Sequence, residues 1–174
     1  MKKLLIVVDY QIDFINGALG FDGAENLSPI IAAKIEKYHS EGFDVAFTLD
    51  THDENYLETS EGRNLPIKHC IRYSEGHRLW PEIEKLKSSG DRTFEKPTFG
   101  SDELFDFLRN SEYDEIELCG LVTDICVISN AIIAKTARPE AVIIVDANAT
   151  DSFDKKKYEA ALAVMESVQI RVLR

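Results

Sequence analysis

Residues 4–8 have the sequence LLIVV and are followed by Asp9. The apolar residues of this segment are continuous and do not alternate with polar ones, which is typical of a parallel strand covered on both faces. The run is too short for the apolar core of a signal peptide. We therefore predict a buried strand that ends at Asp9.

Further apolar runs alternate with segments of helical period. The predicted strands are Phe43–Leu49, a weak one at 91–95, Ile116–Leu121, Val142–Val145 and Val168–Leu173. The predicted helices begin at the cap Ser28 and end near Gly42, span 80–88, follow the cap Ser101, span 124–136 and follow Ser152. This alternation predicts an α/β fold with three αβα layers and a six-stranded, mostly parallel sheet. Residues 51–79 lack a period and are expected to form a long loop, which is often functional.

Length and charge limit the classes of function. The 174 residues suit a single domain, 1–174. Lysine and arginine number 20 against 31 aspartates and glutamates, which gives a formal charge of −11. This balance argues against nucleic acid and anionic membranes as partners, since both attract basic surfaces. No apolar run is long enough to span a membrane, and we expect a cytoplasmic protein.

Polar residues follow the predicted strands at the points where they end. Asp9, Asp50 and Lys96 end the first three strands, and Cys126 comes just after the fourth. Ligands of parallel sheets bind beyond the carboxyl ends of the strands. These residues are therefore the first candidates for a functional site.

The three cysteines have different prospects. With Thr123 as helix cap, Cys126 would lie in the first helical turn, where the helix dipole and a nearby lysine lower a thiol pKa and favour the nucleophilic thiolate. The alternative is a small core residue. Cys119 lies in an apolar strand and is expected in the core, whereas Cys70 in the long loop stays ambiguous.

The segment Asp50-Thr51-His52 suggests a metal site. Residues i and i+2 of an extended segment point the same way, so this carboxylate and imidazole could share an ion. Glu61 and His69 could complete a set of oxygen and nitrogen ligands that suits zinc, iron or manganese. The alternative is that Asp50 and His52 only cap a turn.

The two remaining histidines, His39 and His77, are expected to face solvent without a partner.

A phosphoacceptor receiver domain is a competing interpretation. Asp9, Asp50 and the Lys96-Pro97 pair superficially resemble its acidic pair, phosphoacceptor and lysine. However, Tyr10 replaces the second acid. Two more strands and the Cys126 helix also follow, which argues against this class.

Five short motifs span nearly the whole chain. They are VDYQIDF (8–14), DTH (50–52), PIKHC (66–70), KPTFGS (96–101) and GLVTDICV (120–127). In order and composition they resemble the D-x-Q-x-D-F, D-x-H, P-x-x-H-C, lysine-loop and G-x-x-T-D-x-C-V motifs of the isochorismatase-like cysteine hydrolases. Within that superfamily the resemblance is closest to the nicotinamidases and pyrazinamidases.

The resemblance implies roles for individual residues. Asp9 would be the general base, Cys126 the nucleophile and Lys96 the third catalytic residue, which also keeps Asp9 ionised. A cis peptide between Leu121 and Val122 would direct the backbone N–H groups of Val122 and Cys126 at a developing oxyanion. The implied metal ligands are Asp50, His52, His69 and Glu61. The implied substrate-binding residues are Phe14, Leu19, Leu65, Phe99, Leu121 and Ile125.

The implied reaction is hydrolysis of nicotinamide to nicotinate and ammonia in NAD salvage, through a thioester on Cys126. It would use one divalent metal ion, zinc first, with Fe²⁺ or Mn²⁺ also compatible. Members commonly form homo-oligomers, dimers or tetramers.

Two positions depart from the nicotinamidase pattern, because Thr51 and Leu65 stand where many nicotinamidases have tryptophan. A related cysteine amidase or ureidohydrolase acting on another small amide is therefore the alternative. Hydrolases of isochorismate lack the cysteine, so Cys126 argues against that substrate. A degenerate binding protein without activity is the third possibility.

Overall fold

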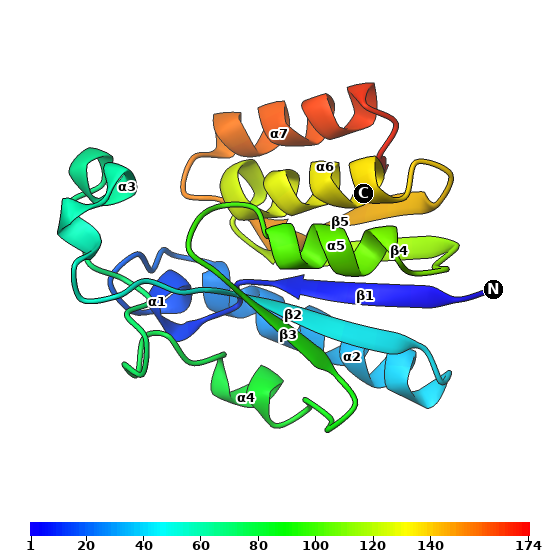
Figure 1. Cartoon of the computed structure of the whole chain (residues 1–174), viewed down its shortest axis with the longest axis horizontal. Coiled ribbons are helices and arrows are strands. Elements are labelled where there is room, and N and C mark those ends of the chain that lie inside the picture. The colour runs from blue at the N-terminus through cyan, green and yellow to red at the C-terminus, as the bar shows by residue number, and fades with distance from the viewer.

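A computed structural model describes all residues, 1–174, and contains one six-stranded sheet (Figure 1). The strands are β1 (Lys3–Val8), β2 (Asp44–Asp50), β3 (Arg92–Lys96), β4 (Glu115–Leu121), β5 (Val142–Asp151) and β6 (Arg171–Leu173). Their order is β3-β2-β1-β4-β5-β6, and every neighbouring pair is parallel. The predicted α/β class is confirmed, and the sheet is parallel throughout.

Helices cover both faces of the sheet and confirm the three-layer architecture (Figure 1). On one face lie α5 (Asp102–Arg109), α6 (Ile128–Ala137) and α7 (Lys155–Ser167). On the other lie α1 (Ile12–Ile15), α2 (Ser28–Ser40) and α4 (Pro81–Glu84).

Strand β1 shows why its sequence is apolar without alternation. Leu4, Ile6 and Val8 belong to the apolar cluster beneath α5, α6 and α7. Leu5 and Val7 belong to the cluster beneath α2. All five are buried, and full burial of such a side chain contributes about 1.5–3 kcal/mol. The central strand is therefore held from both sides.

Element boundaries differ from the prediction in several places. Strand β5 continues to Asp151, β6 begins only at Arg171 and α4 ends at Glu84. The predicted loop at 51–79 contains two short helices, η2 (Tyr56–Glu58) and α3 (Ser60–Asn64). These helices and α1 are too short to show a helical period in the sequence.

Two of the predicted helix caps are wrong. Ser101 does cap α5, because its hydroxyl accepts the N–H of Leu104 at 3.0 Å. Ser28, however, continues directly from η1 (Ala24–Leu27), and its hydroxyl donates to Glu82. Thr123 is the first residue of a π-helical turn, η3 (Thr123–Val127), and its hydroxyl bonds to that of Thr150 at 2.7 Å.

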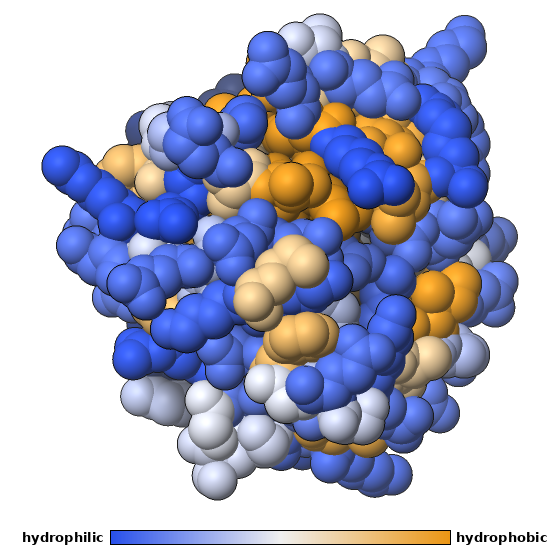
Figure 2. All heavy atoms as spheres, turned by 90° about the vertical axis from the view of Figure 1, so that its right-hand side faces the viewer, coloured by the Kyte–Doolittle hydropathy of each residue, from blue (hydrophilic) through white to orange (hydrophobic).

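The strand order places β1 and β4 side by side, and successive strands extend the sheet in opposite directions from this pair. In open parallel sheets, ligands bind at this position, beyond the carboxyl ends of the strands. Figure 2 shows the opposite end, where the strands begin, as a largely hydrophilic face with scattered apolar areas, the most extended of them in the upper part of the view. None of the helices is both long and apolar enough to cross a membrane.

Candidate active site

The structure brings Asp9, Lys96 and Cys126 together at the carboxyl ends of β1, β3 and β4. Lys96 Nζ lies 2.6 Å from Asp9 Oδ2 and 3.5 Å from Cys126 Sγ, and it donates to the carbonyl oxygen of Thr98 at 3.0 Å. Asp9 and Lys96 are fully buried, and Cys126 is buried. The Lys96 ammonium group thus lies in direct contact with both the Asp9 carboxylate and the Cys126 thiol.

Asp9 is positioned by an abrupt end of strand β1. Its φ of 46° lies in the left-handed region, which turns the chain away from the sheet. Its N–H donates to the carbonyl oxygen of Thr48, and the hydroxyl of Thr48 donates to Asp9 Oδ1 at 2.6 Å. One carboxylate oxygen is therefore held by β2, and the other faces Lys96.

Cys126 is positioned by the turn that follows β4. The predicted cis peptide between Leu121 and Val122 is confirmed. The carbonyl oxygen of Val122 accepts the N–H groups of Ile125 and Val127, which closes η3 around the cysteine.

Asn130 connects this turn to the loop after β3. Its amide donates to the carbonyl oxygens of Cys126 and Phe99, and its Oδ1 accepts the N–H of Ser101. The side chain is fully buried. Sequence reasoning missed this residue, because its contacts join segments about 30 residues apart.

The predicted lowering of the Cys126 thiol pKa is wrong. Burial, followed by the charge of Asp9, raises the pKa of this thiol well above its ordinary value, and the opposing charge of Lys96 is outweighed. Burial also raises the pKa of Asp9, against the lowering effect of Lys96. Burial acts to lower the pKa of Lys96, but the negative charges around it, that of Asp9 first, outweigh burial and raise the pKa. The resting thiol therefore keeps its proton beside a carboxylate that can accept it.

Four side chains with metal-ligating atoms meet beside these residues. They are Asp50, His52, Glu61 and His69, and their ligand atoms all lie within 4.8 Å of one another. Asp50 Oδ2 lies 3.1 Å from His52 Nε2 and 3.2 Å from His69 Nε2, and Glu61 Oε1 lies 3.7 and 3.8 Å from the same nitrogens. The alternative in which Asp50 and His52 only cap a turn is not what the structure shows.

The orientation of this cluster fits a divalent metal ion. His69 Nδ1 bonds to the carbonyl oxygen of Ile67 at 2.8 Å, which leaves Nε2 free to face the carboxylates. Tyr56 packs against both imidazoles, with ring centroids 4.6 Å from His52 and 5.0 Å from His69. Two imidazoles and two carboxylates without a thiolate form a set that zinc, iron and manganese accept.

Asp50 joins the cluster to Lys96. Its Oδ1 lies 3.5 Å from Lys96 Nζ, while its Oδ2 faces the two histidines. Burial acts to raise the pKa of Asp50, but the hydrogen bonds from His52 and His69 and the charge of Lys96 lower it below its ordinary range. This carboxylate is therefore ionised at neutral pH, as a metal ligand must be.

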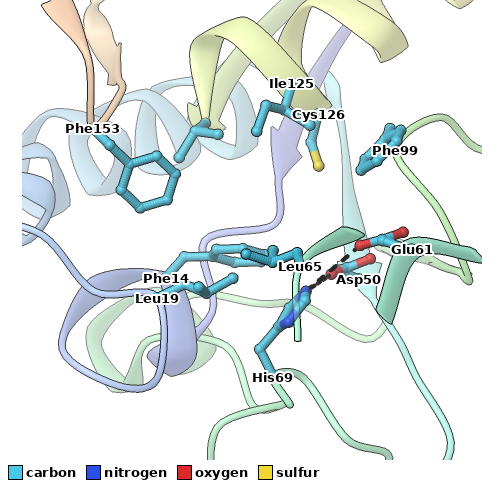
Figure 3. Close-up of a pocket in the computed structure, with 11 residues that line it drawn as sticks. Phe14, Leu19, Asp50, Glu61, Leu65, His69, Phe99, Ile125, Cys126 and Phe153 are labelled. Atoms are coloured by element: carbon cyan, nitrogen blue, oxygen red, sulfur yellow. Dashed lines mark ion pairs between the residues drawn. The ribbon is translucent and has the colours of Figure 1, made fainter. Parts of the chain in front are cut away.

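A cavity of about 300 Å³ opens between Cys126 and the cluster. Figure 3 shows Cys126 on one side, Asp50, Glu61 and His69 across from it, and aromatic and aliphatic side chains around the remaining wall. The lining residues are Phe14, Leu19, Asp50, Glu61, Leu65, His69, Phe99, Val122, Ile125, Cys126 and Phe153. The wall is apolar except at the cluster, so the cavity suits a flat, mostly apolar molecule with one polar edge.

Five of the six residues predicted to bind substrate line this cavity. They are Phe14, Leu19, Leu65, Phe99 and Ile125. Leu121 does not, because its side chain packs in the apolar cluster beneath α2. Sequence reasoning missed Phe153, which no motif contains.

The other two cysteines and the other two histidines do not line the cavity. Cys119 is buried in the core as predicted, and Cys70 is also fully buried. His77 is buried rather than solvent-facing, and its Nε2 bonds to the hydroxyl of Thr51 at 2.8 Å. His39 is partly exposed but has a partner, since its Nε2 lies 3.0 Å from Asp91 Oδ1.

Known proteins resemble this chain over its whole length. The isochorismatase domain matches residues 3–174. The Bacillus subtilis (strain 168) protein PncA, described as an uncharacterized isochorismatase family protein, is 29% identical over 174 residues, which cover 94% of this chain and 93% of that protein. A crystal structure of nicotinamidase PncA from Bacillus subtilis is 30% identical, has a TM-score of 0.87 and is matched over 100% of both chains.

Two further solved structures share the fold. Pyrazinamidase of Pyrococcus horikoshii in complex with zinc has a TM-score of 0.87 at 24% identity, over 100% of this chain and 99% of its own. N-carbamoylsarcosine amidase from Thermoplasma acidophilum has a TM-score of 0.82 at 26% identity, over 100% and 96%.

The fold and these matches define an enzyme of the hydrolase class built on a parallel α/β sheet. The chain belongs to the isochorismatase family.

Proposed function

We propose that this enzyme is a metal-dependent cysteine amidohydrolase that converts nicotinamide and water to nicotinate and ammonia. One observation carries the proposal: Lys96 Nζ contacts the Asp9 carboxylate and lies 3.5 Å from Cys126 Sγ, and Cys126 lines the same cavity as Asp50, Glu61 and His69 of the cluster. A nucleophile, a base and a polar anchor are thus available to one small ligand. The relatives named as nicotinamidase and pyrazinamidase support the choice of substrate.

The residues support acyl transfer through Cys126. Asp9 takes the thiol proton, and the thiolate attacks the carboxamide carbon. The N–H groups of Val122 and Cys126 stabilise the oxyanion, an interaction whose loss typically slows such reactions about 10²–10³-fold. Asp9 returns the proton to the leaving nitrogen, so that ammonia departs and a thioester remains.

The second half of the reaction regenerates the enzyme. Asp9 removes a proton from water, the hydroxide attacks the thioester carbon, and the Cys126 thiolate leaves and regains the proton. The product is the carboxylic acid, released as nicotinate. Lys96 balances the negative charge that moves between Asp9 and Cys126.

The metal ion would be held by Asp50, His52, His69 and Glu61. When bound, it supplies a Lewis acid to which the ring nitrogen of the substrate can bind. Zinc is our first choice, and Fe²⁺ and Mn²⁺ suit the same donor set. Asp50 also contacts Lys96, so the loss of this residue affects both parts of the site.

Ammonia release from millimolar nicotinamide by the purified, metal-loaded protein tests the proposal. We expect turnover by the wild type and none above background by Cys126→Ala. We also expect the Asp50→Ala, His52→Ala double variant to lose both metal and activity. No release by the loaded wild type would overturn the choice of substrate.

A second candidate is a cysteine amidase or ureidohydrolase that acts on another small amide. Leu65 favours it, because this residue lines the cavity where many nicotinamidases have tryptophan. Thr51 departs from the same pattern but does not line the cavity. The likeness to N-carbamoylsarcosine amidase also favours it. Full activity of the double variant on such an amide would select this function.

The biological setting is part of the same proposal. A nicotinamidase would serve NAD salvage in the cytoplasm, and we expect a homo-oligomer. Size-exclusion chromatography with light scattering tests the oligomeric state.

A further inference from the structure

We propose that Phe153, supported by Phe21, is a specificity-determining residue that limits the acyl group to a single flat ring. The inference rests on the proposed amide hydrolysis and adds a limit on substrate size. Phe153 lies outside all five motifs of the chain.

Phe153 closes the cavity on the side away from the metal-ligating cluster. Figure 3 shows its ring across the cavity from Phe99 and Glu61, with Phe14 and Leu19 near it. All the polar lining residues belong to the other side or to the Cys126 region. A ligand whose carboxamide lies at Cys126 and whose polar edge faces the cluster therefore extends its apolar part toward Phe153.

The ring of Phe153 is held in place by a second aromatic ring. The centroids of Phe153 and Phe21 lie 4.8 Å apart at an interplanar angle of 57°. Phe21 comes from the segment between α1 and η1, so two distant parts of the chain form this wall. Phe153 keeps 49% of its surface exposed, and Phe21 packs against its ring.

The backbone beside Phe153 is anchored. The Ser152 hydroxyl donates to Asp124 Oδ1 at 2.5 Å, and the Ser152 N–H donates to Asp151 Oδ1 at 2.8 Å. Ser152 is 1% exposed. The anchor holds the chain next to η3, so the phenyl ring sets the length of the cavity while the backbone stays fixed.

This wall favours single-ring carboxamides over fused two-ring ones. A pyridine ring fits between the cluster and Phe153 in a cavity of about 300 Å³. A second ring fused on the far side from the carboxamide would meet the Phe153 ring. Removal of that ring opens the cavity without changing Cys126 or the cluster.

A matched substrate pair tests the inference. Quinoline-3-carboxamide is nicotinamide with one fused benzene ring. We expect Phe153→Ala to raise the ratio of kcat/KM for quinoline-3-carboxamide to that for nicotinamide by at least about tenfold, since pocket contacts of this size discriminate by such factors. Phe21→Ala should shift the ratio in the same direction by less. An unchanged ratio in Phe153→Ala would overturn the inference.

Leu57→Ala is the control variant. Leu57 is also an exposed apolar residue, at 45%, but it does not line the cavity. We expect its ratio to equal that of the wild type. An equal rise in Leu57→Ala and Phe153→Ala would show a general loosening and would also overturn the inference.

Alkylation of Cys126 gives a readout that does not depend on the substrate. We compare the rates of iodoacetamide and N-(2-naphthyl)iodoacetamide, with modification at Cys126 located by mass spectrometry. Phe153→Ala should raise the relative rate of the bulky reagent about tenfold. If the wild type hydrolyses neither carboxamide, the proposed function fails, and this alkylation ratio alone supports or overturns the role of Phe153.

Discussion

The side chain of Gln11 binds both backbone groups of Asp50. Gln11 Oε1 accepts the N–H of Asp50 at 2.8 Å, and Gln11 Nε2 donates to the carbonyl oxygen of Asp50 at 2.9 Å. Nε2 also donates to the carbonyl oxygen of His77 at 2.8 Å. Strand β1 turns away at Asp9, and its pairing with β2 ends at Thr48. The Gln11 amide therefore takes the place of β1 beside Asp50, the last residue of β2.

We expect Gln11→Met to weaken metal binding by about 10–100-fold, because Asp50 loses the support that fixes its carboxylate. Gln11→Glu should weaken it as well, since a carboxylate accepts the N–H of Asp50 but cannot donate to two carbonyl oxygens. Titration of the metal-free variants with Zn²⁺ measures the dissociation constant. A variant with a lower melting temperature and an unchanged constant would show that Gln11 only stabilises the fold.

Cys126 should react with iodoacetamide in the native protein far faster than the other two cysteines. It lines the cavity, whereas Cys70 and Cys119 are fully buried. Burial raises the pKa of all three thiols, so access to the reagent sets the difference in rate. Peptide mapping after brief alkylation checks this, and Cys126→Ala should take up almost no label until unfolded. Equal labelling of all three cysteines in the native state would contradict the accessibility of Cys126.

Gly120→Ala should destabilise the protein by several kcal/mol. Gly120 has a φ of 110°, and a Cβ there would lie 2.1 Å from the carbonyl oxygen of Val8 on the neighbouring strand. Gly42→Ala is the matched control, because its φ is 73° and no atom lies within 4 Å of the added carbon. The control should cost only about 1–2 kcal/mol for the left-handed backbone. Urea unfolding compares them, and equal losses would contradict the steric argument.

Lys34 should stabilise the fold more at pH 7 than at pH 3. Its Nζ lies 2.6 Å from Glu117 Oε1 and 2.6 Å from Asp146 Oδ2, beneath α2. Burial acts to raise the pKa of Asp146, but the hydrogen bond from Lys34 outweighs it and lowers that pKa. Ionised Asp146 therefore adds stability above its unfolded pKa of about 3.9, and this is lost as the pH falls through the lower folded value.

Lys34→Met tests this dependence. We expect it to lower the free energy of unfolding by about 1–3 kcal/mol at pH 7, as for a hydrogen bond between charged groups. The loss should shrink below about pH 4, where the unfolded chain binds the proton. Urea unfolding of both proteins at pH 7 and pH 3 measures the difference, and the same loss at both values would contradict the assignment.

The sequence by itself determined the sheet and, to within one residue, the carboxyl ends of β1, β2, β3 and β4. Continuous apolar segments such as residues 4–8 must be covered on both faces, which requires helices on both sides of a parallel sheet. Asp9, Asp50 and Lys96 could be placed because they directly follow the predicted strands. The short helices at 56–64 were missed, because elements of this length have no period to recognise.

The tertiary structure decided the features that depend on distant contacts. Phe153 reaches the cavity because β5 continues to Asp151, and Gln11 binds Asp50 because β1 turns at Asp9. The raised pKa of the Cys126 thiol follows from burial, which position in a helix does not predict. Local sequence shows which residues can carry charge or pack, whereas the folded chain decides how deeply each is buried and what it faces.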